Sequence, residues 1–254
     1  MDPLNCFRLD NKTVVVTGAS SGLGVGFSRS LGSVGARLVL AARRGSLLEE
    51  LADDLRDVGT PVFVHETDVT SQQACEELAD AAMEHFGSID VLVNNAGVAA
   101  SAPALHEPPE SFARVIDVNL TGTYWMARAC AARMLPGSSI VNIASVHGLV
   151  ASRFPQAAYA ASKAGVIGLT RDLAQQWTAR KGIRVNALAP GYFASEMTDQ
   201  ARDSLEGMVA DNSLMGRFGQ QQELDPALIY LASPASSYTT GSTLVVDGGL
   251  MTTV

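Results

Sequence analysis

A tyrosine and a lysine on one predicted helix form the first pair in the sequence that could move a proton. Tyr159 and Lys163 occupy positions i and i+4 of a predicted helix over Ala157–Lys181, so their side chains share a face. A free tyrosine has a pKa of about 10 and is a poor base near neutrality. Because a nearby ammonium favours the phenolate, we expect Lys163 to lower that pKa and let Tyr159 exchange a proton with a substrate oxygen.

Two further polar residues could complete this site. Ser145 follows a predicted strand over Ser139–Ala144, where its hydroxyl could hydrogen-bond and orient a carbonyl or alkoxide oxygen. Asn119 falls inside a predicted helix over Ser111–Met134, although Asn is a poor helix former. We therefore expect a local distortion there that holds a water and links Lys163 to solvent. The alternative is that all four are ordinary interface, surface, turn and capping residues.

A glycine-rich turn near the N-terminus could bind a phosphate. It follows a predicted strand over Thr13–Thr17, and its glycines allow a tight turn and a close approach of a phosphate to the main chain. The spacing is Gly-x-x-x-Gly-x-Gly, which differs from the commoner Gly-x-Gly-x-x-Gly fingerprint, and a plain strand-to-helix turn is the alternative. The residues expected to contact the phosphate are Gly18, Ser20, Ser21, Gly22, Leu23 and Gly24.

The end of the second predicted strand, Arg37–Ala41, sets the choice of nucleotide. An acidic residue there would accept hydrogen bonds from the ribose hydroxyls of NAD. This chain has Arg43 and Arg44 instead. Guanidinium groups suit a 2′-phosphate through charge-assisted bonds, so NADP(H) is favoured over NAD(H), with Arg43 the first contact and Arg44 the second. The alternative is that both arginines are solvated at the start of the next helix.

Short apolar runs rich in β-branched residues alternate with longer helical stretches. This pattern predicts an α/β fold with a single domain, a doubly wound (Rossmann) parallel seven-stranded sheet with helices on both faces. The carboxyl ends of parallel strands meet at one edge, where the chemical residues should gather. The predicted strands are Thr13–Thr17, Arg37–Ala41, Val62–Glu66, Val91–Asn94, Ser139–Ala144, Arg184–Ala189 and Thr243–Val246. The predicted helices are Phe27–Val34, Leu47–Val58, Gln72–His85, Ser111–Met134 and Ala157–Lys181.

Composition and charge argue against several other classes of protein. The 254 residues suit one domain, 1–254, and the formal net charge of −8 argues against a nucleic-acid partner. No window has the roughly 18 uninterrupted apolar residues of a membrane span, and the first ten residues lack an apolar signal core. We therefore expect a cytoplasmic protein with no membrane partner. The cysteines and histidines lack the spacing of metal ligands, so no metal site is expected.

Four motifs, taken together and in order, resemble those of the short-chain dehydrogenase/reductase superfamily. They are Thr-Gly-Ala-Ser-Ser-Gly-Leu-Gly at 17–24, Asn-Asn-Ala-Gly at 94–97, Tyr-Ala-Ala-Ser-Lys at 159–163 and Pro-Gly at 190–191. The resemblance spans 9–249, nearly the whole chain. It implies an oxidoreductase that transfers hydride between a nicotinamide cofactor and a ketone or secondary alcohol. The implied catalytic tetrad is Asn119, Ser145, Tyr159 and Lys163.

The resemblance also implies further cofactor contacts and an assembly. Lys163 would hydrogen-bond the nicotinamide ribose. The other implied contacts are Asp68 and Val69 beside the adenine, Asn95, Ala96 and Gly97 under the cofactor, and Pro190, Gly191, Phe193 and Ser195 at the nicotinamide. The family often has Thr where Ser195 stands. It is often tetrameric, so a homotetramer or dimer is expected, with Tyr238–Val254 helping to form an interface.

The substrate side of the site is less defined. We expect 192–218 to cover the active site as a lid that excludes water, and the alternative is a helical pair that buries its own apolar stripe. The segment between Ser145 and Tyr159 should form the opposite wall. Candidate substrate contacts are His147, Gln156, Tyr192 and Met197. Arg153 either binds an anionic substrate or is solvated.

Several substrate classes and one non-catalytic alternative remain open. The overall pattern resembles 3-oxoacyl-carrier-protein reductases, whereas residues 190–198 resemble sugar-acid dehydrogenases of the gluconate 5-dehydrogenase type. A reductase of carrier-bound substrates should show a basic docking patch, because carrier proteins are acidic. The candidates for that patch are Arg128, Arg133, Arg180 and Lys181. Steroids and other secondary alcohols also stay open. A nucleotide-sensing protein without catalysis usually lacks a tetrad member, and this chain retains all four.

Overall fold

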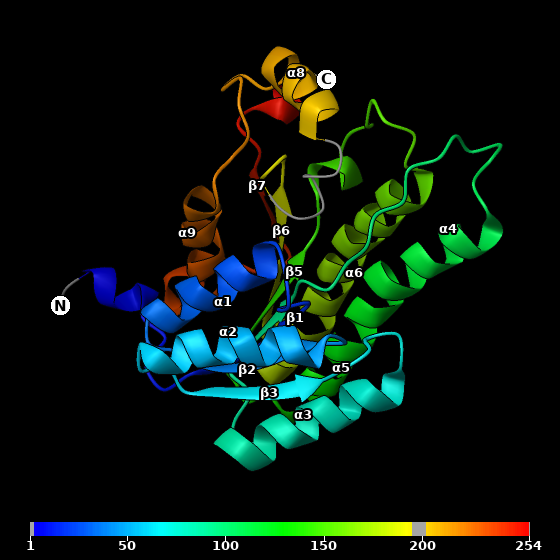
Figure 1. The fold of residues 1–254 in the computed structure, drawn as a ribbon. Helices are drawn as coiled ribbons and strands as arrows, with labels where there is room; N and C mark the ends of the chain where they lie inside the picture. Colours follow the sequence, from blue (N-terminus) through cyan, green and yellow to red (C-terminus); the bar gives the residue numbers. More distant parts are fainter. Residues whose placement is uncertain (1–2, 195–201, 254) are drawn as a thin grey trace.

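A parallel sheet of seven strands lies between two layers of helices in the computed structural model, which describes residues 3–194 and 202–253 (Figure 1). The strand order is β3-β2-β1-β4-β5-β6-β7, and every neighbouring pair is parallel. The strands are β1 (Thr13–Thr17), β2 (Arg37–Ala42), β3 (Val62–Glu66), β4 (Val91–Asn94), β5 (Ser139–Ile143), β6 (Arg184–Pro190) and β7 (Thr243–Val246). The predicted fold class is therefore confirmed, and each predicted strand is correct to within one residue at either end.

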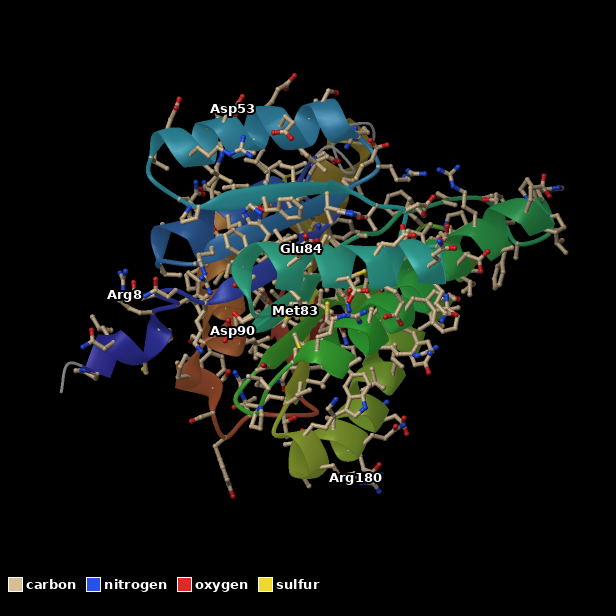
Figure 2. All side chains as sticks on the ribbon, turned by 90° about the horizontal axis from the view of Figure 1, so that it is seen from below. Arg8, Asp53, Met83, Glu84, Asp90 and Arg180 are labelled. Atoms are coloured by element: carbon tan, nitrogen blue, oxygen red, sulfur yellow. The ribbon has the colours of Figure 1, made fainter. Side chains whose placement is uncertain are left out.

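Two hydrophobic clusters, one on each face of the sheet, hold the helices in place. Helices α1 (Leu23–Ser33), α2 (Gly45–Asp57) and α9 (Gln221–Ala232) pack on one face. Helices α3 (Gln72–Phe86), α5 (Gly122–Arg133) and α6 (Ala157–Lys181) pack on the other. Figure 2 shows this separation, with Asp53 of α2 and Glu84 of α3 on opposite sides of the sheet. Apolar side chains on both faces explain why the strands read as nearly continuous apolar runs.

Helix boundaries were harder to predict than strands. Helix α1 begins at Leu23, four residues before the predicted start at Phe27, because it continues directly from the glycine turn. Helix α9 was not predicted, since it contains Pro226, which removes a backbone donor. It forms because its buried leucines recur at helical spacing and because Gln220 and Glu223 cap its start reciprocally. Helix α8 (Arg202–Asn212) lies within the segment predicted as a lid.

The helix predicted over Ser111–Met134 is interrupted. It consists of α4 (Pro109–Ile116), one π-helical turn over Asp117–Thr121, and α5. The expected distortion at Asn119 is thereby confirmed, since Asn119 lies in the middle of that turn. A single π turn widens the helix locally and is frequent at functional sites.

Two buried asparagines link the sheet to the helices that carry the site. The Asn94 Nδ2 atom of β4 donates to Asn142 Oδ1 of β5 at 2.9 Å and to the Thr123 carbonyl of α5 at 3.2 Å. Asn142 Nδ2 donates to Thr170 Oγ1 of α6 at 2.9 Å. These amides fix α5 and α6 against the carboxyl-terminal half of the sheet. No helix within the described residues is long and apolar enough to cross a membrane.

We predict that Asn142→Ala lowers the free energy of unfolding by about 1–3 kcal/mol, because it leaves buried partners without a hydrogen bond. Urea unfolding followed by tryptophan fluorescence measures this change. Asn5→Ala is the matched control, since Asn5 is exposed. Equal stability of the two variants would contradict the structural role assigned to Asn142.

Candidate active site

The turn between β1 and α1 is shaped to bring the main chain close to a bound group. Gly18 and Gly22 have φ values of +66° and +55°, a region that favours glycine. A Cβ atom at Gly24 would overlap the Gly18 carbonyl oxygen. Among the described residues no side chain caps the start of α1 at Gly22. The first N–H groups of α1 are therefore suited to an anion such as a phosphate.

The motif after β4 supports this turn from beneath. Thr17 Oγ1 accepts hydrogen bonds from the backbone N–H groups of Asn95 at 3.0 Å and Ala96 at 3.1 Å. Asn95 Nδ2 donates to the carbonyls of Thr17 and Gly18 at 3.0 and 3.1 Å. A Cβ at Gly18 would lie 2.8 Å from Ala96 Cα. The side chain of Asn95 thus fixes the position of the glycine turn.

Two exposed arginines, Arg43 and Arg44, follow β2 at the same edge of the sheet. Arg44 Nη2 donates to Ser21 Oγ at 2.6 Å, and its Nε donates to Ser20 Oγ at 3.3 Å. Arg44 therefore reaches the serines of the glycine turn, although β2 and α2 carry it. The structure brings a cation and two hydroxyl groups together where a phosphate-bearing ligand could bind.

Asp68 follows β3 and lies close enough to Arg43 for their charges to interact. Its pKa is lowered first by a hydrogen bond from the Thr70 backbone N–H at 3.0 Å, then by the Thr70 hydroxyl and by the charge of Arg43. Asp68 is therefore ionised and oriented close to Arg43. Its neighbour Val69 is buried against Gly122.

Lys163 is a buried cation at the carboxyl end of β5. Its side chain is 5% exposed, and its Nζ donates to the Ile143 carbonyl at 2.7 Å. Burial lowers the pKa of Lys163 to about 8. The same nitrogen lies 5.7 Å from the centre of the Tyr159 ring. The pair predicted from i, i+4 spacing is thus brought together beside the sheet edge.

The direction of the Tyr159 pKa shift differs from the prediction. Burial raises the pKa of Tyr159, and a hydrogen bond with the Ser145 side chain acts in the opposite direction. The expected lowering by Lys163 is therefore wrong for this structure, because loss of hydration on burial outweighs the hydrogen bond with Ser145. Ser145 itself is buried at the end of β5, and its Oγ accepts from the His147 N–H at 3.2 Å.

Asn119 joins three parts of the site through its amide. Its Oδ1 accepts from the Val98 N–H at 2.8 Å, and its Nδ2 donates to the Val98 carbonyl at 2.9 Å. The same Nδ2 donates to Ser162 Oγ at 3.0 Å, and Ser162 in turn donates to the Tyr159 carbonyl at 2.7 Å. A Cβ at Gly97 would lie 3.4 Å from Asn119 Oδ1 and 3.7 Å from Lys163 Nζ. The π turn therefore holds Asn119 between the β4 motif and α6.

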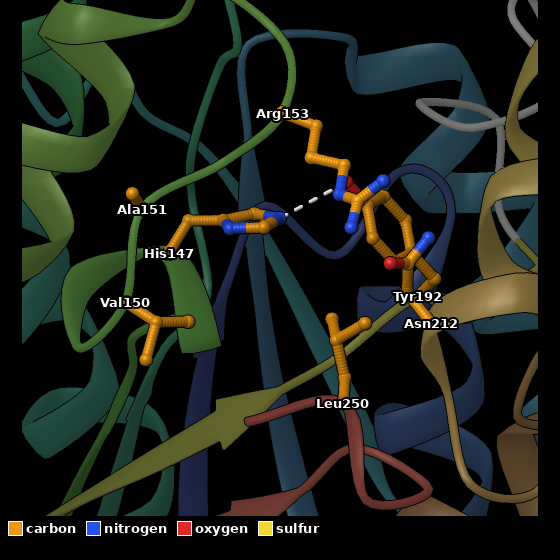
Figure 3. A pocket seen from close by; sticks show the side chains of 7 residues that line it. All are labelled: His147, Val150, Ala151, Arg153, Tyr192, Asn212 and Leu250. Atoms are coloured by element: carbon orange, nitrogen blue, oxygen red, sulfur yellow. Dashed lines mark hydrogen bonds between the residues drawn. The ribbon is translucent and has the colours of Figure 1, made fainter. Parts of the chain in front are cut away.

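A small cavity lies beside the loop between β5 and α6 (Figure 3). Two residues that line it, His147 and Tyr192, are joined by a hydrogen bond of 3.0 Å between Nε2 and Oη. Burial lowers the pKa of His147 and raises that of Tyr192, so both are neutral near pH 7. Two of the four candidate substrate residues are thus brought together. The lining residues are His147, Val150, Ala151, Arg153, Tyr192, Asn212 and Leu250.

The remaining candidates do not line this cavity, and two of them lie outside the described residues. Gln156 precedes α6 and does not line the cavity. Pro190 ends β6, and Gly191 lies so close to Asp247 that no side chain would fit. Phe193 is buried in the core against Gly219. Ser195 and Met197 fall within 195–201, outside the described residues.

Asn212 and Leu250 also line the cavity, although neither was predicted from the sequence. Asn212 ends α8, and Leu250 belongs to the C-terminal segment, so neither is near a motif in the sequence. The two segments are joined because Ser213 Oγ and the Met215 N–H donate to the Gly248 carbonyl at 2.9 and 3.0 Å. The Gly248-Gly249 pair, with φ values of +63° and +84°, was the one sequence signal of this close turn.

Comparisons with known proteins agree with this arrangement. The family model described as enoyl-(acyl carrier protein) reductase matches residues 18–251. Galactitol 2-dehydrogenase (L-tagatose-forming) of Cereibacter sphaeroides is 41% identical, over 98% of either chain. The 3-oxoacyl-[acyl-carrier-protein] reductase of Rickettsia bellii is 36% identical, over 96% of this chain and 98% of the relative.

A solved structure is similar over almost the full length. It is a gluconate 5-dehydrogenase from Burkholderia cenocepacia J2315 in complex with NADP and tartrate, with 36% identity and a TM-score of 0.93. The likeness covers 99% of both chains. The resemblance inferred from the four motifs is confirmed, and this chain belongs to the short-chain dehydrogenase/reductase superfamily of oxidoreductases.

Proposed function

We propose that this protein transfers hydride between NADP(H) and a ketone or secondary alcohol, with Tyr159 as the general acid and base. The main support is the buried ammonium of Lys163, whose Nζ lies 5.7 Å from the Tyr159 ring. The Ser145 hydroxyl hydrogen-bonds the same phenol. A buried cation, a phenol and a hydroxyl at one sheet edge suit proton exchange with a carbonyl oxygen.

The chain's own residues supply the proton and hold the reacting oxygen. When bound, the nicotinamide supplies or accepts hydride at carbon. Tyr159 Oη donates a proton to the carbonyl oxygen during reduction, and Ser145 Oγ hydrogen-bonds that oxygen. The raised pKa of Tyr159 keeps the phenol protonated, which suits reduction. Oxidation needs the phenolate, which the positive charges of Lys163 and the oxidised cofactor would favour.

The proposed preference for NADP(H) is supported by the two arginines that follow β2, next to the glycine turn. Its phosphate-binding N–H groups come from the start of α1, and Arg43 and Arg44 would contact the 2′-phosphate. Arg44 already hydrogen-bonds Ser20 and Ser21, so its guanidinium lies within reach of the turn. The solved gluconate 5-dehydrogenase holds NADP, which supports the same cofactor here.

The substrate is more consistent with a small keto sugar acid or polyol than with a 3-oxoacyl thioester. Arg133, a candidate for a carrier docking patch, is bonded to Glu76 and Asp80 at 2.8 Å each. Lys181 donates to the Ala131 carbonyl at 2.5 Å, and Arg128 lies over the Trp125 ring. Most of the basic residues considered for such a patch are therefore already engaged within the chain.

We further propose that the active site is closed by a lid and that the protein forms an oligomer. Residues 192–218 would act as a lid, and the bonds of Ser213 and Met215 to Gly248 would anchor its end. A homotetramer or dimer would use the C-terminal segment Tyr238–Val254, whose Tyr238 is fully exposed. The protein would act in the cytoplasm.

Tyr159→Phe is expected to lower kcat by about 10²- to 10⁴-fold, because it removes the proton donor. Binding of NADPH, followed by nicotinamide fluorescence, should be unchanged. Tyr124→Phe is the control, since Tyr124 is an exposed tyrosine of α5. Full activity of Tyr159→Phe would overturn the mechanism.

The double substitution Arg43→Gln and Arg44→Gln should raise KM for NADPH about tenfold or more and leave turnover with NADH unchanged, since it removes charge-assisted bonds to the 2′-phosphate. Steady-state kinetics with both cofactors measure the effect. Arg29→Gln, on α1 and paired with Asp54, is the control. Wild-type turnover with NADH as efficient as with NADPH would refute the preference.

The buried ammonium of Lys163 should make stability depend on pH. Its folded pKa of about 8 lies below the unfolded value of about 10.4, so the unfolded chain binds more protons between them. The free energy of unfolding should therefore rise with pH from about 8 to about 10, by up to about 3 kcal/mol. Urea unfolding should show that Lys163→Met removes this rise, whereas the exposed control Lys12→Met keeps it. The same slope in both variants would argue against the lowered pKa.

A further inference from the structure

A glutamate ends the strand next to the two arginines that follow β2. Glu66 is the last residue of β3 and pairs in register with Ala42, the last residue of β2. Arg43 is the first residue beyond this pair, and the side chain of Glu66 is exposed. A carboxylate therefore lies beside the point where the chain leaves β2 towards the arginines proposed to contact a 2′-phosphate.

The carboxylate of Glu66 lies at the start of α2. A Cβ atom on Gly45, the first residue of α2, would lie 3.1 Å from Glu66 Oε2 and 3.9 Å from Glu66 Cδ. Glycine at this position thus leaves room for the carboxylate. A helix start also favours a negative charge, which helps to keep Glu66 there.

The negative charge of Glu66 is not neutralised within the protein. No ion pair joins Glu66 to a cation within 3–194 and 202–253. Asp68 differs, because it accepts hydrogen bonds from the Thr70 N–H and hydroxyl at 3.0 and 2.8 Å, and because the charge of Arg43 helps to lower the pKa of Asp68. Of the two carboxylates at the end of β3, Glu66 is therefore the one whose charge is free to act on a bound anion.

A 2′-phosphate distinguishes NADP(H) from NAD(H) and brings up to two negative charges to this edge of the sheet. We propose that Glu66 is a specificity-determining residue, whose carboxylate repels the 2′-phosphate held by Arg43 and so weakens NADP(H) binding relative to NAD(H). The inference rests on the proposed function, in which Arg43 and Arg44 contact that phosphate. Because the charges are exposed to solvent, the repulsion is modest and reduces the preference for NADP(H) without reversing it.

The test compares pairs of nucleotides that differ only in the 2′-phosphate. Isothermal calorimetry on the full chain measures the Kd of 2′,5′-ADP against 5′-AMP, and of NADPH against NADH. We expect Glu66→Gln to tighten the binding of 2′,5′-ADP and NADPH about three- to tenfold at low salt, and to leave 5′-AMP and NADH within about twofold. The gain should shrink at about 0.5 M KCl, because ions screen exposed charges.

Two further variants complete this comparison. Glu66→Lys should give a larger gain than Glu66→Gln, because it replaces repulsion by attraction. Glu84→Gln is the matched control and should change none of the four Kd values. Glu84 is an exposed glutamate of α3, on the other side of the sheet from α2 (Figure 2).

Unchanged or weaker binding of 2′,5′-ADP in Glu66→Gln would overturn the inference. An equal gain for 5′-AMP would also overturn it, because the effect would then not depend on the 2′-phosphate. Arg43→Gln separates this inference from the proposed function. If Arg43→Gln weakens the binding of 2′,5′-ADP and Glu66→Gln has no effect, only the role of Glu66 is rejected. A selective gain in Glu66→Gln without hydride transfer to any ketone would support the inference and reject the proposed function.

Discussion

The hydrogen bond from Lys163 Nζ to the Ile143 carbonyl is the constraint on which the site depends. It places a buried ammonium at the carboxyl end of β5 and fixes the rotation of α6, so that Tyr159 faces the sheet edge. Gly148 must lack a side chain, because a Cβ there would lie 2.6 Å from the Lys163 carbonyl carbon. The loop after β5 can therefore pack directly on α6, which brings Ser145 to Tyr159. Asn142, through Thr170, secures the same helix two turns further along.

The parallel sheet brings distant motifs to one edge. The glycine turn follows β1, the motif with Asn95 follows β4, and Ser145 follows β5. Strand order β2-β1-β4-β5 makes these ends neighbours, and the hydrogen bonds of Thr17 to the β4 motif join two of them. Ligands of such folds bind outside the carboxyl ends of the strands. The fold thus accounts for why residues separated by more than a hundred positions could act on one molecule.

The sequence predicted the sheet well, because strands buried on both faces leave an unmistakable apolar run. It also indicated the distortion at Asn119, since Asn is a poor helix former and stands inside a stretch that otherwise predicts a helix. It misjudged the pKa of Tyr159, because spacing reveals the neighbouring ammonium but not the loss of hydration that opposes it. Asn212 and Leu250 were missed for another reason. They line the cavity because the end of α8 packs on the C-terminal segment. A contact between two such distant segments cannot be predicted from the residues near either one.

The central claim is that this edge transfers hydride to a carbonyl carbon while Tyr159 supplies the proton. It is tested most directly by incubating the protein with a panel of keto acids, keto sugars and ketones and with NADPH carrying deuterium at either the 4R or the 4S position. The account predicts that one of the two forms transfers its deuterium to the new carbinol carbon, as read by mass spectrometry, and that the other does not. Tight binding of NADPH without labelled alcohol from any substrate would contradict it.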